Sequence, residues 1–160
     1  MVLELPTGEN IVNPTKADIC EILERNSAYW LQGTGQAALI KNDVSKIYTA
    51  LIFSFNPKYG YYVLDLDNYK APLGNENDRS LLIAEDSGGD PFLIPLCCYL
   101  NHSQAKRILA HFLDYEEFID YDEWYDIYEG QDESIEGNEI YNSITFGEIL
   151  KITNGKVARV

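Results

Sequence analysis

The sequence is poor in basic residues and contains few of the side chains on which most active sites depend. It has 12 Lys and Arg against 26 Asp and Glu, two histidines and three cysteines. A net charge of −14 repels phosphate backbones and anionic membranes, so we expect no direct binding to nucleic acid or membrane. No apolar run approaches the roughly 18 residues that span a bilayer, and residues 1–6 lack the features of a signal peptide. The expected location is therefore cytoplasmic.

The cysteines and histidines match no recognisable catalytic or metal-binding pattern. Cys97 and Cys98 are adjacent in an apolar run, which is typical of buried free thiols in a reducing compartment. With His102 they form no zinc spacing such as C-x₂-C. His102 and His111 fall in a predicted helix, and the sequence assigns neither a nucleophile nor a carboxylate partner. We predict no metal, no cofactor and no enzymatic activity.

Two other patterns have simple structural interpretations. A lone G-x-G at 32–36 stands between predicted strands and lacks a following helix, which indicates a hairpin turn rather than a phosphate-binding loop. The pairs Asp65/Asp67 and Asp120/Asp122 could form acid–base dyads or Mg²⁺ sites, but 26 acids in 160 residues make close pairs common by chance. A small hydrolase that uses such a carboxylate pair remains an alternative, and it requires the pair to be buried in a cleft.

Length and composition predict one folded domain. With 160 residues, 46% of them apolar and 12% aromatic, the chain can bury a core without disulfides or metals. We predict a single domain over residues 1–160, with its core at about 11–126 and a C-terminal extension at 127–160. The expected class is α+β, an antiparallel sheet of about five to six strands with helices packed on one face.

Two helices are predicted from capping residues and from the spacing of apolar residues. Thr15, with Asp18 three residues later, begins a helix from about 16 to 25 that ends at Asn26. Ser103 is expected to cap the second helix. The apolar face of that helix is formed by Ala105, Ile108, Leu109, Phe112 and Leu113.

Short runs rich in Tyr, Ile, Val and Phe predict an antiparallel meander between residues 28 and 67. The runs are AYWLQ, GQAALIK, IYTALIFSF and GYYVLDLD. Because side chains alternate along a strand, Asp65 and Asp67 are expected on a solvated face opposite Leu64 and Leu66. LLIAED and FLIPLCCYL predict two more strands, the second an edge strand or bulge because of Pro95. ITFGEILKI predicts a last helix or strand.

The acidity is concentrated in one segment, residues 114–139, which we call the acidic segment. It holds twelve acids and no Lys or Arg, whereas residues 1–113 hold 13 acids and 9 bases. Aromatic residues alternate with the acids at roughly helical spacing, namely Tyr115, Phe118, Tyr121, Trp124, Tyr125 and Tyr128. Tyr and Trp are enriched at interface hot spots, and carboxylates steer cationic partners. Alternatively, the aromatics pack on the chain's own sheet and only the acids face water.

The order of several features resembles a known family. These are Ile11-Val12 before a helix, the Gly88-Gly89 turn, Phe92-Leu93-Ile94-Pro95, the helix from Ser103-Gln104-Ala105 to Phe112-Leu113, and then Trp124. Over residues 11–126 the chain resembles the immunity proteins of bacterial polymorphic-toxin systems, specifically the first-numbered (Imm one) family. The family usually has a glycine after the helix, where this chain has Asp114-Tyr115-Glu116, and it tends to end soon after the tryptophan.

The resemblance implies a small cytosolic α+β protein that binds and blocks a cognate toxin domain without catalysis. Such toxins are frequently nucleases or deaminases with basic surfaces, which the acidic segment would complement. The predicted toxin-binding residues are Asp114, Glu116, Glu117, Asp120, Tyr121, Asp122, Glu123, Trp124, Tyr125 and Asp126. An acidic mimic of nucleic acid that inhibits a DNA-binding protein is an alternative, although it predicts a double row of carboxylates. The Smi-one/Knr-four-like immunity proteins are another, but their Leu-Pro-x-x-Tyr opening is missing here.

Overall fold

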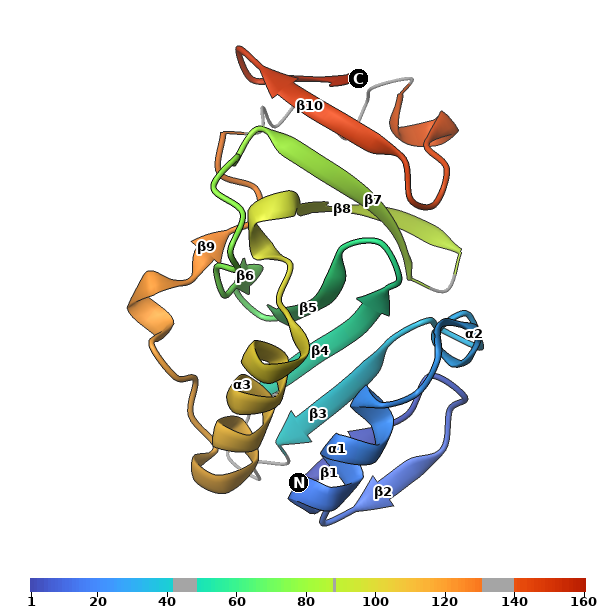
Figure 1. The fold of residues 1–160 in the computed structure, drawn as a ribbon, viewed down its shortest axis with the longest axis vertical. Helices are drawn as coiled ribbons and strands as arrows, with labels where there is room; N and C mark the ends of the chain where they lie inside the picture. Colours follow the sequence, from blue (N-terminus) through green and yellow to red (C-terminus); the bar gives the residue numbers. More distant parts are fainter. Residues whose placement is uncertain (42–48, 88, 131–139) are drawn as a thin grey trace.

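Two antiparallel sheets and three α-helices form the described part of the chain (Figure 1). This computed structural model describes residues 1–41, 49–87, 89–130 and 140–160. The first sheet has seven strands in the order β2-β1-β3-β4-β5-β6-β9, and the second has four in the order β11-β10-β7-β8. The predicted α+β class is confirmed. The strands outnumber the five to six expected, because the first sheet alone has seven, some of them only two or three residues long, and a second sheet adds four.

The strands of the first sheet are mostly short, and each pairs antiparallel with its neighbours. They are β1 (Val2–Glu4), β2 (Asn10–Val12), β3 (Ala37–Lys41), β4 (Thr49–Asn56), β5 (Gly60–Asp65), β6 (Lys70–Ala71) and β9 (Tyr125–Asp126). The second sheet contains β7 (Leu81–Ser87), β8 (Asp90–Pro95), β10 (Ile149–Thr153) and β11 (Lys156–Arg159). The predicted meander corresponds to β3, β4 and β5, and its turn at Asn42-Asp43 lies outside the described residues.

The two predicted helices are present, and one of them begins at a different cap. In α1 (Lys16–Leu23), Thr15 and Asp18 form the expected capping box. In α3 (His102–Tyr115), the cap is Asn101, whose side chain accepts from the Gln104 N–H at 2.9 Å while Gln104 bonds back to the Asn101 N–H. The prediction of Ser103 as the cap was therefore wrong, because the Asn–Gln box satisfies the free backbone groups two residues earlier.

The first run of the predicted meander, AYWLQ at 28–32, is not a strand. Residues Ser27–Trp30 form a single helical turn, α2, and the Asn26 side chain caps it by accepting from the Tyr29 N–H at 3.2 Å. Tyr and Trp favour strands when they lie on a half-buried sheet, but here the local cap decides the backbone conformation. Trp30 is buried beneath this turn with an exposed fraction of 2%.

Both faces of the first sheet are covered, so the prediction of one solvated face was wrong. On one face α1 and α3 lie against β1, β3, β4 and β5 around a core that includes Phe53, Val63 and Phe112. On the other face, Tyr62 and Leu64 pack with Ile83 and Ile94 of the second sheet. Asp65 is therefore fully buried on the helix side, and Leu66, which was expected to pack, is 42% exposed.

The second sheet has its own outer core, formed largely by the C-terminal residues. β10 pairs with β7 so that Leu150 lies beside Leu82, and Ile140 and Ile144 pack over this face. β8 is an edge strand that ends at Pro95, as the loss of a backbone donor predicts. Residues placed in the C-terminal extension thus complete a sheet. Within the described ranges no helix is both long and apolar enough to cross a membrane.

Candidate functional site

The described part of the acidic segment, residues 114–130, begins in the last two residues of α3 and continues from Glu116 as a loop instead of a helix. α3 ends where Glu116 adopts a left-handed conformation (φ 56°) and its N–H donates to the Phe112 carbonyl at 2.8 Å. Glycine usually occupies the left-handed position at the end of a helix. Glu116 adopts this conformation here, so the helix ends at this point although the chain lacks the glycine that the resemblance led us to expect. The loop then turns through a 3₁₀ segment, Tyr121–Glu123, and joins β9. The helical spacing predicted for its aromatics was wrong.

Four aromatic rings hold the loop against α3 and the first sheet. Phe118 stacks on Phe112 with ring centroids 5.2 Å apart and on Tyr121 at 4.8 Å. Trp124 contacts Phe118 at 5.2 Å and Tyr121 at 5.4 Å, and its indole N–H donates to the Ile119 carbonyl at 2.9 Å. Aromatic pairs of this kind add about 0.5–1.5 kcal/mol each beyond the area that they bury. This aromatic cluster gives the loop one defined conformation.

A buried carboxylate anchors the cluster to the sheet. The Tyr121 hydroxyl donates to Asp65 Oδ2 at 2.5 Å, and the Asn68 side-chain amide and the Asp67 N–H also donate to Asp65 at 2.8 and 3.1 Å. Three donors compensate the cost of burying this acid. Partial burial, together with the hydrogen bond to Asp65, raises the pKa of Tyr121, so its hydroxyl remains a donor at neutral pH. Lys70 lies over the Tyr121 ring, with Nζ 5.0 Å from the centroid.

The loop is attached again at its far end, where β9 pairs with β6. Tyr125 is opposite Ala71 in this pairing, and its ring enters the core between the two sheets with 7% exposure. Trp124 is similarly buried at 6%. Both were predicted to contact a toxin; burial removes Tyr125 from that surface and leaves of Trp124 only the part that lines the pocket described below. The alternative, in which aromatics pack on the chain's own sheet, describes them correctly, whereas Tyr115 and Tyr128 are 64% and 49% exposed.

All acids of the described part of the acidic segment are exposed. Three of them form ion pairs at the surface: Asp114 with Lys16 at 2.5 Å, Glu116 with Lys41 at 3.1 Å and Asp120 with Arg107 at 3.6 Å. Exposed pairs of this kind contribute little to stability, about 0–1 kcal/mol each. The remaining acids form no ion pair with any described residue, and these are Glu117, Asp122, Glu123, Asp126 and Glu129. The other four acids of the acidic segment, Asp132, Glu133, Glu136 and Glu139, lie outside the described residues.

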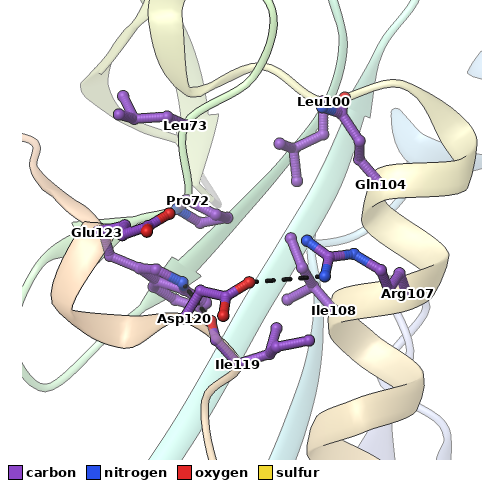
Figure 2. Close-up of a pocket in the computed structure, with 10 residues that line it drawn as sticks. Pro72, Leu73, Leu100, Gln104, Arg107, Ile108, Ile119, Asp120 and Glu123 are labelled. Atoms are coloured by element: carbon purple, nitrogen blue, oxygen red, sulfur yellow. Dashed lines mark hydrogen bonds and ion pairs between the residues drawn. The ribbon is translucent and has the colours of Figure 1, made fainter.

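A small pocket of about 90 Å³ lies between α3 and this loop (Figure 2). The apolar part of its wall comes from Pro72, Leu73, Leu100, Ile108, Ile119 and Trp124, and the polar part from Gln104, Arg107, Asp120 and Glu123. Asp120 and Glu123 stand on the loop side, and the Arg107 guanidinium reaches across from α3 to Asp120. The site therefore combines an apolar recess with carboxylates at its edge. One of these is already held by an arginine of the chain itself.

The other candidates from the sequence take different places in the structure. Cys97 and Cys98 are buried free thiols, as predicted, with sulfur atoms 3.9 Å apart in a 3₁₀ turn (Leu96–Cys98). His102 and His111 are on α3, where their rings contact Tyr61 and Tyr115. No group of three or more His, Cys, Asp or Glu able to hold a metal occurs among the residues that the structure describes.

The carboxylate pairs considered for acid–base chemistry are separated by their environments. Asp65 is buried and bonded to Tyr121, while Asp67 is exposed and has a pKa raised by partial desolvation and by Asp65. Asp120 and Asp122 are both exposed. Neither pair shares a cleft, which is what the hydrolase alternative requires.

The sequence predictions did not identify the two acids that are buried in the structure. Asp65 and Glu85 are each in a strand otherwise rich in apolar residues, with exposed fractions of 0% and 4%. An acid flanked by apolar residues in a predicted central strand was the available signal. For Asp65 this signal was interpreted as the solvated side of the sheet, because a cover on both faces of the sheet was not predicted.

Comparisons with known proteins add no family assignment. No protein-family model matches the chain, and no curated protein or solved structure matches it. The likeness to the Imm one family therefore stays a prediction from the sequence, and the function is argued from the geometry described above.

Proposed function

We propose that this protein is a non-catalytic inhibitor that binds a basic protein domain through the acidic segment. In a bacterial polymorphic-toxin system this partner would be the cognate toxin domain, a nuclease or deaminase with a basic substrate-binding surface. The protein would act in the cytoplasm as an immunity protein. The observation that carries the proposal is a group of exposed carboxylates, five of them without an ion pair to any described residue, on a loop that packed aromatic rings hold against α3 and the first sheet.

A fixed loop favours tight binding because ordering a flexible segment costs free energy at the moment of association. That cost is about 0.5–1.5 kcal/mol for each immobilised side chain. Here Phe118 and Trp124 are already packed, and β9 holds the far end of the loop in the sheet. The carboxylates are therefore positioned before the partner arrives, and they accelerate its approach by long-range attraction.

The pocket beside the loop suggests how a basic partner is anchored. Its apolar wall suits the methylene stem of an arginine or lysine, and the carboxylates of Asp120 and Glu123 suit the cationic end. The pairing of Arg107 with Asp120 shows that a guanidinium fits against this carboxylate. A partner's arginine would bind Glu123 and compete with Arg107 for Asp120.

The test is to measure binding of the purified protein to the toxin domain encoded beside its gene. A variant with Asp122→Asn, Glu123→Gln and Asp126→Asn removes three charges that form no ion pair with a described residue, and it preserves side-chain shape. Exposed charge pairs contribute up to about 1 kcal/mol each, so we expect a loss of roughly 2 kcal/mol, or about thirtyfold in Kd. Calorimetry at low and at high salt should show that the variant is also less sensitive to salt.

A matched control removes the same number of charges at the other end of the chain, with Glu9, Glu21 and Glu24 changed to Gln. These residues are exposed and are not part of the acidic segment. The control should retain affinity and salt dependence close to the native protein. Equal weakening by both variants would mean that net charge alone matters, and unchanged affinity of the first variant would refute the assignment of the surface.

A further inference from the structure

Two tyrosines form an exposed pair at the edge of the first sheet. Tyr69 directly precedes β6, and Tyr128 follows β9, with exposed fractions of 43% and 49%. Their ring centroids are 5.2 Å apart, and the ring planes are inclined at 60°. The two residues meet because β6 pairs with β9 at this edge of the sheet (Figure 1), and the Ile127 N–H donates to the Tyr69 carbonyl at 3.0 Å. We call Tyr69 and Tyr128 the tyrosine pair.

The backbone on both sides holds the two rings in place. Tyr69 adopts a left-handed conformation (φ 53°), which a bulky residue rarely takes, and its ring lies beside that of Tyr128. Ile127 is 1% exposed in the core between the sheets, so it fixes the backbone of its neighbour Tyr128. The Tyr128 N–H also donates to Asp126 Oδ1 at 2.9 Å. A partner would therefore meet two positioned rings, which lowers the cost of ordering side chains on association.

Acidic residues flank the tyrosine pair along the chain. Asp126 and Glu129 lie close to Tyr128 in the sequence. Asp67 precedes Tyr69 by two residues. All three acids are exposed, and none of them forms an ion pair with a described residue. Exposed aromatic rings surrounded by negative charge are complementary to a cationic side chain.

Cations of the chain itself lie over two neighbouring tyrosine rings. Lys70 Nζ is 5.0 Å from the centroid of the Tyr121 ring. The guanidinium carbon of Arg79 is 5.1 Å from the centroid of the Tyr125 ring. The face of an aromatic ring attracts a cation, and the planar guanidinium of arginine both stacks on a ring and donates to carboxylates. Because tyrosine and arginine are also enriched at interface hot spots, an arginine is the side chain that fits the tyrosine pair best.

We propose that the tyrosine pair binds an arginine side chain of a basic protein partner. The guanidinium stacks on a ring of the pair, and its N–H groups donate to the flanking carboxylates. This inference rests on the proposed function and adds to it a contact residue, Tyr69, that lies outside the acidic segment. The contact is separate from the pocket between α3 and the loop, because neither Tyr69 nor Tyr128 lines that pocket. The partner is thus held at two places.

The probe is a short oligoarginine peptide with blocked ends, and calorimetry at physiological ionic strength measures its binding to the full chain. Tyr69→Asn removes one ring and keeps the left-handed backbone, which asparagine tolerates, and Tyr128→Ala removes the other ring. Neither change alters the net charge, so each should weaken binding about tenfold through the lost ring alone. Tyr115→Ala is the matched control, because Tyr115 is also an exposed tyrosine of the acidic segment, and it should change binding less than about twofold.

An oligolysine peptide of the same length carries the same charge without the planar guanidinium, so it should bind the native protein more weakly. Undiminished binding in the folded variants, an equal loss in Tyr115→Ala, or equal affinity for oligolysine would each overturn the proposal. Tyr128→Ala decides the outcome if Tyr69→Asn fails to fold. A native dimer in sedimentation velocity that Tyr69→Asn converts to a monomer would also overturn it, because a second copy would then cover the tyrosine pair.

The proposed function can fail separately from this inference. The same variants are measured with the toxin domain encoded beside the gene. If the triple acid variant weakens binding of that domain and Tyr69→Asn does not, only the assignment of the tyrosine pair is refuted. If the domain does not bind the native protein at all, the proposed function is refuted, and the oligoarginine measurement still decides whether the tyrosine pair recognises arginine.

Discussion

Changing Tyr121 to Phe tests whether the buried carboxylate of Asp65 holds the acidic segment in place. The substitution keeps the ring that stacks on Phe118 and removes only the hydroxyl that donates to Asp65 Oδ2. Asp65 is fully buried and keeps two weaker donors, from Asn68 and from its own loop. A hydrogen bond to a charged group contributes about 1.5–3 kcal/mol, so we expect the free energy of unfolding to fall by about 2 kcal/mol.

For a chain of this size, a loss of that magnitude lowers the melting temperature by about 4–8 °C. Urea unfolding followed by circular dichroism measures the free energy, and Tyr115→Phe is the matched control. Tyr115 is 64% exposed, so removal of its hydroxyl should change stability by less than about 0.5 kcal/mol.

The same variant should loosen the loop before the whole protein unfolds. The amide of Glu123 donates to the Asp120 carbonyl at 2.9 Å, and the amide of Trp124 donates to the Tyr121 carbonyl at 3.0 Å. Both amides should exchange with deuterium faster in Tyr121→Phe, while amides within β4 remain protected to the same degree relative to global stability. If Tyr121→Phe and Tyr115→Phe were equally stable, the anchoring role of Asp65 would be refuted.

Two other changes test separate parts of the fold. Asn101→Ala removes the cap of α3 and should cost about 1 kcal/mol in urea unfolding, whereas Ser103→Ala should be nearly neutral; the reverse order would contradict the observed capping box. Glu85→Gln tests linkage to pH. Burial raises the pKa of Glu85 in the folded state, so the folded state binds the proton of this carboxyl more tightly than the unfolded state does. The resulting contribution to stability is fully present below the unfolded-state pKa. It is lost as the pH rises through the folded-state pKa. Unfolding of the native protein should therefore show this loss above about pH 4.5, and the Gln variant should lack it; identical pH profiles would show that Glu85 is not desolvated.

The elements that the sequence predicted correctly are those fixed by neighbouring residues. The capping box of Thr15 and Asp18 lies within one helical turn, and the alternation from Ala37 to Asp65 gives the three-stranded meander. Pro95 predicted an edge strand because the loss of a donor is a local property. α2 was mistaken for a strand because Asn26 was assigned to the end of the preceding helix, although its side chain caps the next one.

The candidate site was predicted in part. The concentration of acids is a fact of composition, and their exposure follows from the cost of burying charge without a partner. The sequence did not decide whether the aromatic residues of the acidic segment are exposed or buried, since an alternating pattern fits both an exposed surface and a packed loop. Trp124 and Tyr125 are buried because the loop folds back between α3 and β6, a path that no local pattern encodes.

The sequence by itself determined the three-stranded meander, the capping box of α1 and the place where negative charge accumulates, because these depend on residues a few positions apart. Only the tertiary structure decided which acids face water. Asp65 is buried because Tyr121, 56 residues later in the chain, donates to it, and Glu85 is buried because a second sheet covers the first. Burial is a property of contacts between distant segments, and the alternation of side chains along a strand does not state whether one face or both will be covered.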